Sequence, residues 1–254
     1  MATNWPEGKK IYFLSDFHLG IPDLKGSLER EKKIVRFLDE AMKDAAEIFL
    51  VGDLFDFWFE YKKVIPKGFI RLQGKMAEIA DSDIKLHVFT GNHDMWMFGY
   101  YEQELDIPVY KEPIIREWNG KKFYIAHGDG LGPGDKGYKF LKKIFSNKVC
   151  QVLFGLIPPY FGMKLATYLS TENKLISGEE DAKFLGEDKE WLVIHSKEIE
   201  AKEHFDYYVY GHRHLPMDIT IGQNSRYISL GDWIKYFTYA VFDGEKLELK
   251  TYEG

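Results

Sequence analysis

The sequence predicts an α/β fold, and three observations support this. Short apolar segments with the length of buried strands recur along the first 90 residues. Segments with apolar residues at helical spacing separate them, as in a sheet built from alternating strands and helices. The apolar segments end in polar loops, at the edge where an open α/β sheet binds its ligands.

The elements of the first half follow this alternation. Expected strands cover residues 10–14, 48–51 and 85–90, and expected helices cover 27–44, capped by Ser27, and 69–80. The pattern then changes at Asn119-Gly120, which predicts a tight hairpin turn between strands 114–118 and 122–126.

The second half begins with an interruption. Residues 135–173 contain two amphipathic segments, 138–156 and 161–169, on either side of two prolines. We expect an inserted helical cap on a single domain that spans residues 1–254. After it we expect a helix over 191–202, a strand over 207–210, and antiparallel strands separated by turns at 222–224 and 243–244.

Composition limits the classes of function. A chain of 254 residues with 45% hydrophobic residues can bury a large core. A net charge of -6 argues against a nucleic-acid partner. The one cysteine, Cys150, suits a reducing compartment, and its apolar neighbours favour a packed thiol. We see no signal peptide and no apolar run of the ~20 residues that a spanning helix needs, so we expect a cytoplasmic location.

Polar residues that can bind metals follow the predicted strands. They are Asp16, His18, Asp53, Asp56, Asn92, His93, Asp94, His127, His212 and His214. A mixture of carboxylate, amide and imidazole ligands suits Mn²⁺, Fe or Zn²⁺ better than Ca²⁺ or Mg²⁺, which prefer oxygen alone. Seven ligands from this list would be too many for one ion, but they would serve two ions that share a carboxylate.

The order of these residues carries a resemblance. The segments Asp16-x-His18, Gly52-Asp53-x-x-Asp56, Gly91-Asn92-His93-Asp94, His127-Gly128 and Gly211-His212-x-His214 resemble the five motifs of the calcineurin-like metallophosphoesterases, in family order. Each motif alone is weak, and their order and common placement make the match specific. The resemblance spans nearly the whole chain. It implies a two-sheet β-sandwich flanked by helices, with a dinuclear metal centre at its loop edge.

The resemblance also implies roles for these residues. One metal would bind Asp16, His18 and His214, the other would bind Asn92, His127 and His212, and Asp53 would bridge them. Two divalent ions are expected, Mn²⁺ first with Fe or Zn²⁺ as alternatives. A hydroxide that bridges two such metals attacks phosphorus in line, and both metals stabilise the developing charge.

Three polar residues beside the ligands have other expected roles. His93 would be catalytic, because it can protonate the leaving oxygen or stabilise its charge. Asp94 would hold the His93 imidazole. Asp56 would orient a ligand, although a carboxylate that starts a helix or a turn explains it equally well.

The substrate is indicated by two further segments. Residues 130–138, just before the helical insertion, and residues 52–58 are similar to those of the UDP-2,3-diacylglucosamine pyrophosphatases of lipid A biosynthesis. The resemblance implies hydrolysis of UDP-2,3-diacylglucosamine, a nucleotide-linked glycolipid, to UMP and 2,3-diacylglucosamine 1-phosphate, with the cap holding acyl chains. Asp135 and Tyr138 would contact the sugar or its chains, and Lys142, Lys143, Lys164 and Lys174 would meet phosphate oxygens.

The cap itself has more than one interpretation. The apolar run 153–163 beside lysines is typical of an acyl-chain groove or of a peripheral contact with the inner membrane. Two packed helices would explain the same pattern. The sequence makes no prediction of the oligomeric state.

Two other functions stay open. His93 stands where the pyrophosphatases typically carry arginine, and the cap has lysines where theirs has arginines, which bind phosphate in a fork. The chain could therefore be a phosphoesterase for a nucleotide, a phosphodiester or a phosphoprotein. A non-catalytic scaffold that reuses the fold is disfavoured, because every ligand position is filled.

Overall fold

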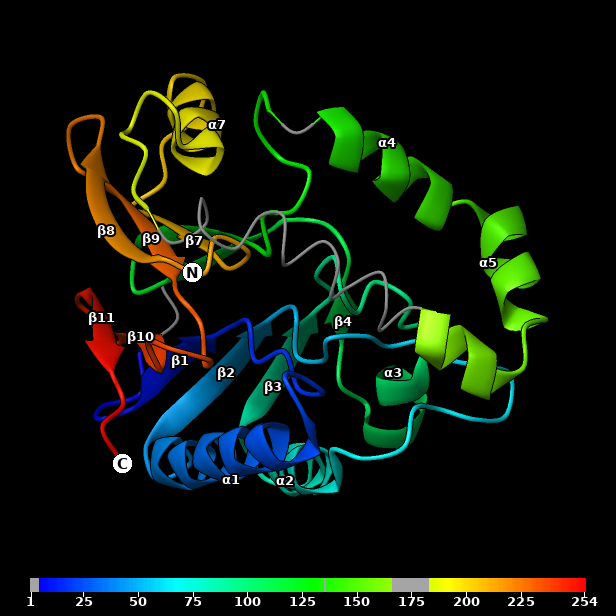
Figure 1. Ribbon diagram of the computed structural model, residues 1–254. Coiled ribbons are helices and arrows are strands. Elements are labelled where there is room, and N and C mark those ends of the chain that lie inside the picture. The colour runs from blue at the N-terminus through cyan, green and yellow to red at the C-terminus, as the bar shows by residue number, and fades with distance from the viewer. Residues whose placement is uncertain (1–4, 135, 166–182) are drawn as a thin grey trace.

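Two β-sheets lie face to face in a computed structural model, which describes residues 5–134, 136–165 and 183–254 (Figure 1). The first sheet has the order β11-β10-β1-β2-β3-β4, and the second has the order β5-β6-β7-β9-β8. The strands of the first are β1 (Lys10–Leu14), β2 (Ala45–Val51), β3 (Lys85–Phe89), β4 (Val109–Tyr110), β10 (Thr238–Phe242) and β11 (Leu247–Thr251). Those of the second are β5 (Ile114–Trp118), β6 (Lys121–Ala126), β7 (Tyr207–Tyr210), β8 (Pro216–Ile221) and β9 (Ser225–Leu230).

Helices cover the outer faces of both sheets. Helices α1 (Leu24–Ala41) and α2 (Ile70–Ala80) lie on the first sheet, and α7 (Trp191–Glu200) lies on the second (Figure 1). Aromatic rings fill the space between the sheets, where Phe13 stacks on Phe49 and Phe123 at centroid distances of 5.1 and 6.1 Å. The predicted α/β sandwich flanked by helices is confirmed.

Parallel strands set the position of the polar loops. Strands β1, β2 and β3 pair in parallel, as do β6, β7 and β9. Their carboxyl ends therefore lie along one edge of each sheet, and the loops that follow them can meet. No helix of the described residues is both long and apolar enough to cross a membrane.

The cap extends from the sandwich as an arch. It contains α4 (Lys136–Phe145), α5 (Lys148–Gly155) and a helical turn over residues 159–165 (Figure 1). Phe154 of α5 anchors it, because its ring lies 4.7 Å from that of Trp96 and 4.8 Å from that of Phe59. Trp96 Nε1 also donates to the Phe145 carbonyl over 2.8 Å. Residues 166–173 of the predicted insertion lie outside the described residues.

Several local predictions needed correction. The first helix starts at Leu24 and is capped by Asp23, which accepts from Gly26 N, so the prediction of a Ser27 cap is wrong. Ser27 lies inside the helix, where its hydroxyl accepts from Gly20 N. The segment 138–156 is two helices, because the Asn147 side chain accepts from the backbone and starts α5. Strand β4 and the short helix α3 (Tyr100–Leu105) were not predicted.

The hairpin turn is confirmed. Asn119 and Gly120 have φ angles of 47° and 73°, which the predicted tight turn requires. Cys150, predicted to be packed, is half-buried.

Candidate metal centre

Strained backbone marks the edge where the loops meet. Asp16, His18, Asp53, His212 and His214 all have φ angles between 44° and 66°. Residues other than glycine rarely adopt this left-handed conformation, and such strain gathers at functional sites. The loops hold one another in it, because His18 N donates to the Asp53 carbonyl and Asp16 N donates to the Gly52 carbonyl.

One group of ligand atoms lies at the ends of β1 and β7. His18 Nε2 and His214 Nε2 are 3.0 Å apart, and Asp16 Oδ1 is 3.3 Å from His214 Nε2 and 3.7 Å from His18 Nε2. Asp16 and His18 are fully buried. Two imidazole nitrogens aimed at one point beside a carboxylate are the donors that a transition metal prefers.

A second group lies at the ends of β3, β6 and β7. His127 Nε2 is 3.4 Å from Asp53 Oδ2 and 3.4 Å from Asn92 Oδ1. His212 Nδ1 lies 2.8 Å from the same amide oxygen. The other ring nitrogen of His127, Nδ1, lies 2.8 Å from the Val51 carbonyl. A hydrogen bond from Nδ1 to this carbonyl leaves the Nε2 lone pair available to bind a metal ion.

Asp53 connects the two groups. Its Oδ1 accepts from His93 N over 2.8 Å. Its Oδ2 is buried without a hydrogen-bond partner, 3.6 Å from His18 Nε2 and 3.4 Å from His127 Nε2. A buried carboxylate oxygen without a partner is costly unless a cation satisfies it. The residues at this edge therefore fit two divalent ions that share Asp53.

Electrostatics favour positive charge at this place. Burial opposes ionisation of Asp53, but the imidazoles of His127 and His93 outweigh it and lower the pKa of the carboxyl. Burial likewise opposes protonation of His127, yet Asp53 and Asp16 raise the pKa of its imidazole to about 10. The carboxylates thus favour a positive charge near His127 Nε2, which is what a divalent cation supplies.

Two motif glycines are explained by close approach. A Cβ atom on Gly91 would lie 2.2 Å from Asp53 Oδ1, and one on Gly211 would lie 2.8 Å from Asp16 Oδ2. Any side chain at either position would push a candidate ligand out of place. The glycines therefore serve the geometry of the metal centre.

Comparison with known proteins agrees with this geometry. The sequence profile of the calcineurin-like phosphoesterases matches residues 9–216. The chain belongs to this family. Together with relatives that are named hydrolases, this makes the chain a metal-dependent hydrolase, as predicted.

Relatives match over nearly the full chain. A Porphyromonas gingivalis protein named UDP-2,3-diacylglucosamine hydrolase is 37% identical and covers 96% of this chain and 98% of its own. A protein of the same name from Ectopseudomonas mendocina is 24% identical and covers 96% and 98%. Among solved structures, the phosphoesterase Yfce from E. coli has 15% identity and a TM-score of 0.46 over 95% of this chain and 92% of its own.

Asp56 lies behind the ligands of this calcineurin-like enzyme. Its Oδ1 is 3.4 Å from His18 Nδ1 and 3.6 Å from His93 Nδ1. Its carbonyl oxygen lies 3.0 Å from His93 Nδ1. The ligand atoms of these three residues lie within 4.8 Å of one another. The contacts thus put Asp56 beside two imidazoles.

Asp94 has different contacts from those expected. Its carboxylate accepts from the backbone N–H groups of Leu54, over 2.8 Å, and Gly91, over 2.7 Å. Burial and the charge of Asp53 raise its pKa to about 7. Asp94 therefore holds two loops together, and the described contacts that orient His93 come from Asp56.

The predicted substrate residues are spread over the cap. Tyr138 donates to Asp129 Oδ2 over 2.6 Å, and Lys142 Nζ lies 2.7 Å from the same oxygen. Lys143 and Lys164 are exposed on the cap. Asp135 and Lys174 lie outside the described residues.

One polar residue at the metal edge was missed by sequence reasoning. Asp232 follows β9, is buried, and has its Oδ2 3.8 Å from His214 Nδ1. Its neighbour Trp233 donates its backbone N–H to the Asp16 carbonyl. The pattern that could have found it is Gly231-Asp232 after a buried strand, the same pattern as Gly52-Asp53.

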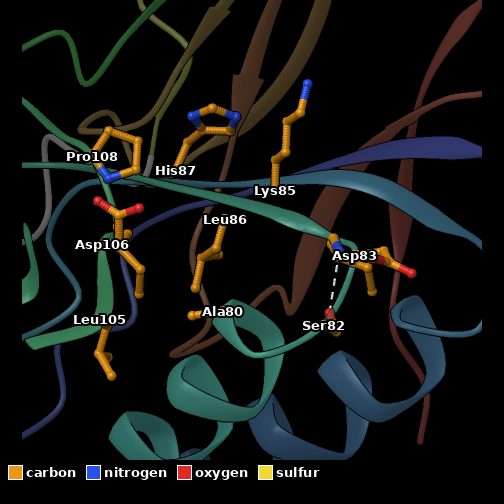
Figure 2. Close-up of a pocket in the computed structure, with 11 residues that line it drawn as sticks. Ala80, Ser82, Asp83, Lys85, Leu86, His87, Leu105, Asp106 and Pro108 are labelled. Carbon is orange, nitrogen blue, oxygen red and sulfur yellow. Dashed lines mark hydrogen bonds between the residues drawn. The ribbon is translucent and has the colours of Figure 1, made fainter.

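A separate cavity lies away from this edge. Figure 2 shows it between the start of β3 and the end of α3. Its volume is about 370 Å³. Ser82, Lys85, His87, Asp106 and Pro108 are among its lining residues. Because it adjoins the amino-terminal start of β3, it is not part of the metal centre.

Proposed function

We propose that this enzyme hydrolyses UDP-2,3-diacylglucosamine to UMP and 2,3-diacylglucosamine 1-phosphate. The observation that carries the proposal is the convergence of two ligand groups on the unpartnered Oδ2 of Asp53. The name and 37% identity of the Porphyromonas gingivalis relative supply the substrate.

In this proposal the residues divide between two metals. Asp16, His18 and His214 would hold one ion, Asn92, His127 and His212 would hold the other, and Asp53 would be shared by both. The ligand distances described above support this division. The mixed donors favour Mn²⁺, with Fe or Zn²⁺ as alternatives.

The chemistry consumes one water. When bound, the two ions activate a water near neutral pH and stabilise charge on the phosphoryl oxygens. The water oxygen joins one phosphorus, and the bond from that phosphorus to the bridging oxygen of the pyrophosphate breaks. His93 protonates the leaving oxygen or stabilises its charge, and Asp56 orients the His93 imidazole through Nδ1.

The inserted cap, residues 135–173 of a single domain, is proposed to hold the acyl chains. Phe154 faces the sandwich, whereas Val149, Val152, Leu153 and Leu156 lie at helical spacing and are 59–74% exposed. An apolar helix face that is left in solvent beside lysines favours contact with a lipid surface. We therefore propose a peripheral membrane contact through this face.

The polar residues of the cap are proposed to contact the head group. Lys143 and Lys164 are exposed and would meet phosphate oxygens, as would Lys174. Asp135 would contact the sugar or its chains. Tyr138 and Lys142 bind Asp129, so we propose that they set the position of α4. From there Tyr138 would contact the sugar or its chains, and Lys142 would meet phosphate oxygens.

One experiment tests the substrate. The purified enzyme is incubated with Mn²⁺ and UDP-2,3-diacylglucosamine, and UMP is measured; a chromogenic phosphodiester is assayed in parallel. UMP release that disappears in Asp53→Asn supports the proposal. Cleavage of the chromogenic ester without UMP release would refute the lipid substrate and favour another phosphoester. The presence of His93, where the pyrophosphatases typically carry arginine, also favours that alternative.

A further inference from the structure

Arg30 is a buried arginine under the metal edge. It lies in α1, and only 8% of its surface is exposed. Its guanidinium donates to the carbonyl oxygen of His18 over 3.0 Å and to the carbonyl of Ile21. The residue therefore holds the backbone of the loop that carries Asp16 and His18.

The charges of two buried carboxylates act on this cation. Burial lowers the pKa of Arg30, and the charges of Asp232 and Asp56 oppose that effect. Asp232 Oδ1 also accepts from the backbone N–H groups of Lys235, over 2.7 Å, and Ile234, over 3.0 Å, so its orientation is fixed by its own turn. Arg30 is the only buried arginine among the described residues.

The carboxylates face the rear of two candidate ligands. Asp56 Oδ1 lies 3.4 Å from His18 Nδ1, and Asp232 Oδ2 lies 3.8 Å from His214 Nδ1. The Nε2 atoms of the same two imidazoles face each other at 3.0 Å. A carboxylate behind Nδ1 favours a proton there and leaves the Nε2 lone pair for a metal.

A positive charge on this side of the loops favours the arrangement. Two carboxylates buried behind neighbouring imidazoles lose hydration and repel each other. A positive charge nearby compensates for both effects. The Arg30 guanidinium supplies a positive charge while it donates to the His18 carbonyl.

We propose that Arg30 is a positioning residue for the metal bound by Asp16, His18 and His214, acting through its hydrogen bond to the His18 carbonyl. This inference rests on the metal centre proposed above. Arg30 touches neither metal nor substrate in it. Its loss weakens one of the two metal sites and leaves the site at His127 and His212 intact.

Metal binding to the metal-free protein tests this. Mn²⁺ is titrated by calorimetry into the wild type, Arg30→Met, Arg30→Lys and the control Arg36→Met, an exposed arginine of the same helix. We expect two ions in the wild type and in the control. In Arg30→Met we expect one of the two affinities to fall by about 10- to 100-fold, the range for loss of residues that support metal ligands. Arg30→Lys keeps the charge and should recover part of the affinity.

The outcomes separate this inference from the proposed function. If folded Arg30→Met binds two ions with wild-type affinity, Arg30 only fastens a loop and the inference is overturned. If the wild type binds no Mn²⁺, Fe or Zn²⁺, the metal centre itself fails and the inference fails with it. If Arg30→Met does not fold, Arg30→Lys takes its place, because lysine lacks the guanidinium group that binds the His18 carbonyl: weaker binding at one of the two sites supports the inference, and two unchanged affinities overturn it.

Discussion

Replacing Gly91 by alanine should damage the metal centre, although Gly91 is not itself a ligand. The new Cβ would lie 2.2 Å from Asp53 Oδ1 and 2.7 Å from the Asp53 backbone nitrogen. Ordinary contacts of a Cβ begin at 3.4 Å, so the carboxylate or the loop must move by about 1 Å, and displacements of that size can cost about 10²-fold in rate. The Asp53 backbone nitrogen cannot give way as the end of a flexible side chain would.

The assay compares Gly91→Ala with Gly74→Ala. A Cβ on Gly74, inside α2, meets nothing within 4 Å, so alanine there should be neutral or stabilise the helix by up to about 1 kcal/mol. We expect Gly91→Ala to lose about 100-fold in kcat/KM and to bind Mn²⁺ more weakly, while Gly74→Ala retains both. Wild-type metal affinity and activity in Gly91→Ala would refute the proposed closeness of Gly91 and Asp53.

Three other changes test separate parts of the structure. His93→Ala should lower kcat by about 10²- to 10⁴-fold with both metals retained, because the His93 backbone N–H that binds Asp53 remains in alanine; loss of metal would contradict the catalytic role. Glu31→Ala should lower the free energy of unfolding by about 1–2 kcal/mol in urea, because Glu31 accepts from the first N–H groups of α2, which has no side-chain cap of its own; exposed Glu29→Ala is the control. Val152→Asp with Leu156→Asp should reduce sedimentation with vesicles of anionic lipid, and unchanged binding would count against membrane contact through α5.

Much of the fold could be predicted from the sequence, because apolar runs and turn residues act locally. The strand 10–14 and the strand 207–210 have the predicted bounds, and Asn119-Gly120 turns as expected. Tyr100–Leu105 and Val109–Tyr110 were missed, because a six-residue helix and a two-residue strand are too short to show a period. Ser27 and Asp23 both fit a helix cap, and only the backbone conformation distinguishes them.

The candidate site was predictable as a set of residues, not as an arrangement. Polar residues after strands identified the side chains that the structure brings together around Asp53. The role of Asp94 could not be predicted, because adjacency to His93 in the chain does not say where its carboxylate points. Arg30 and Asp232 lie outside the motifs, and their relation to His18 and His214 depends on how a helix and a distant strand pack together.

The central claim is that Asp53 holds two metals at once. The most direct measurement is the number of Mn²⁺ ions bound per chain, by calorimetry and elemental analysis, in the wild type and in folded Asp53→Asn. Because Asp53 Oδ2 lies 3.6 Å from His18 Nε2 and 3.4 Å from His127 Nε2, we predict two ions in the wild type and weakened binding of both in the variant. A variant that loses one ion and keeps the other at wild-type affinity would contradict the bridging role.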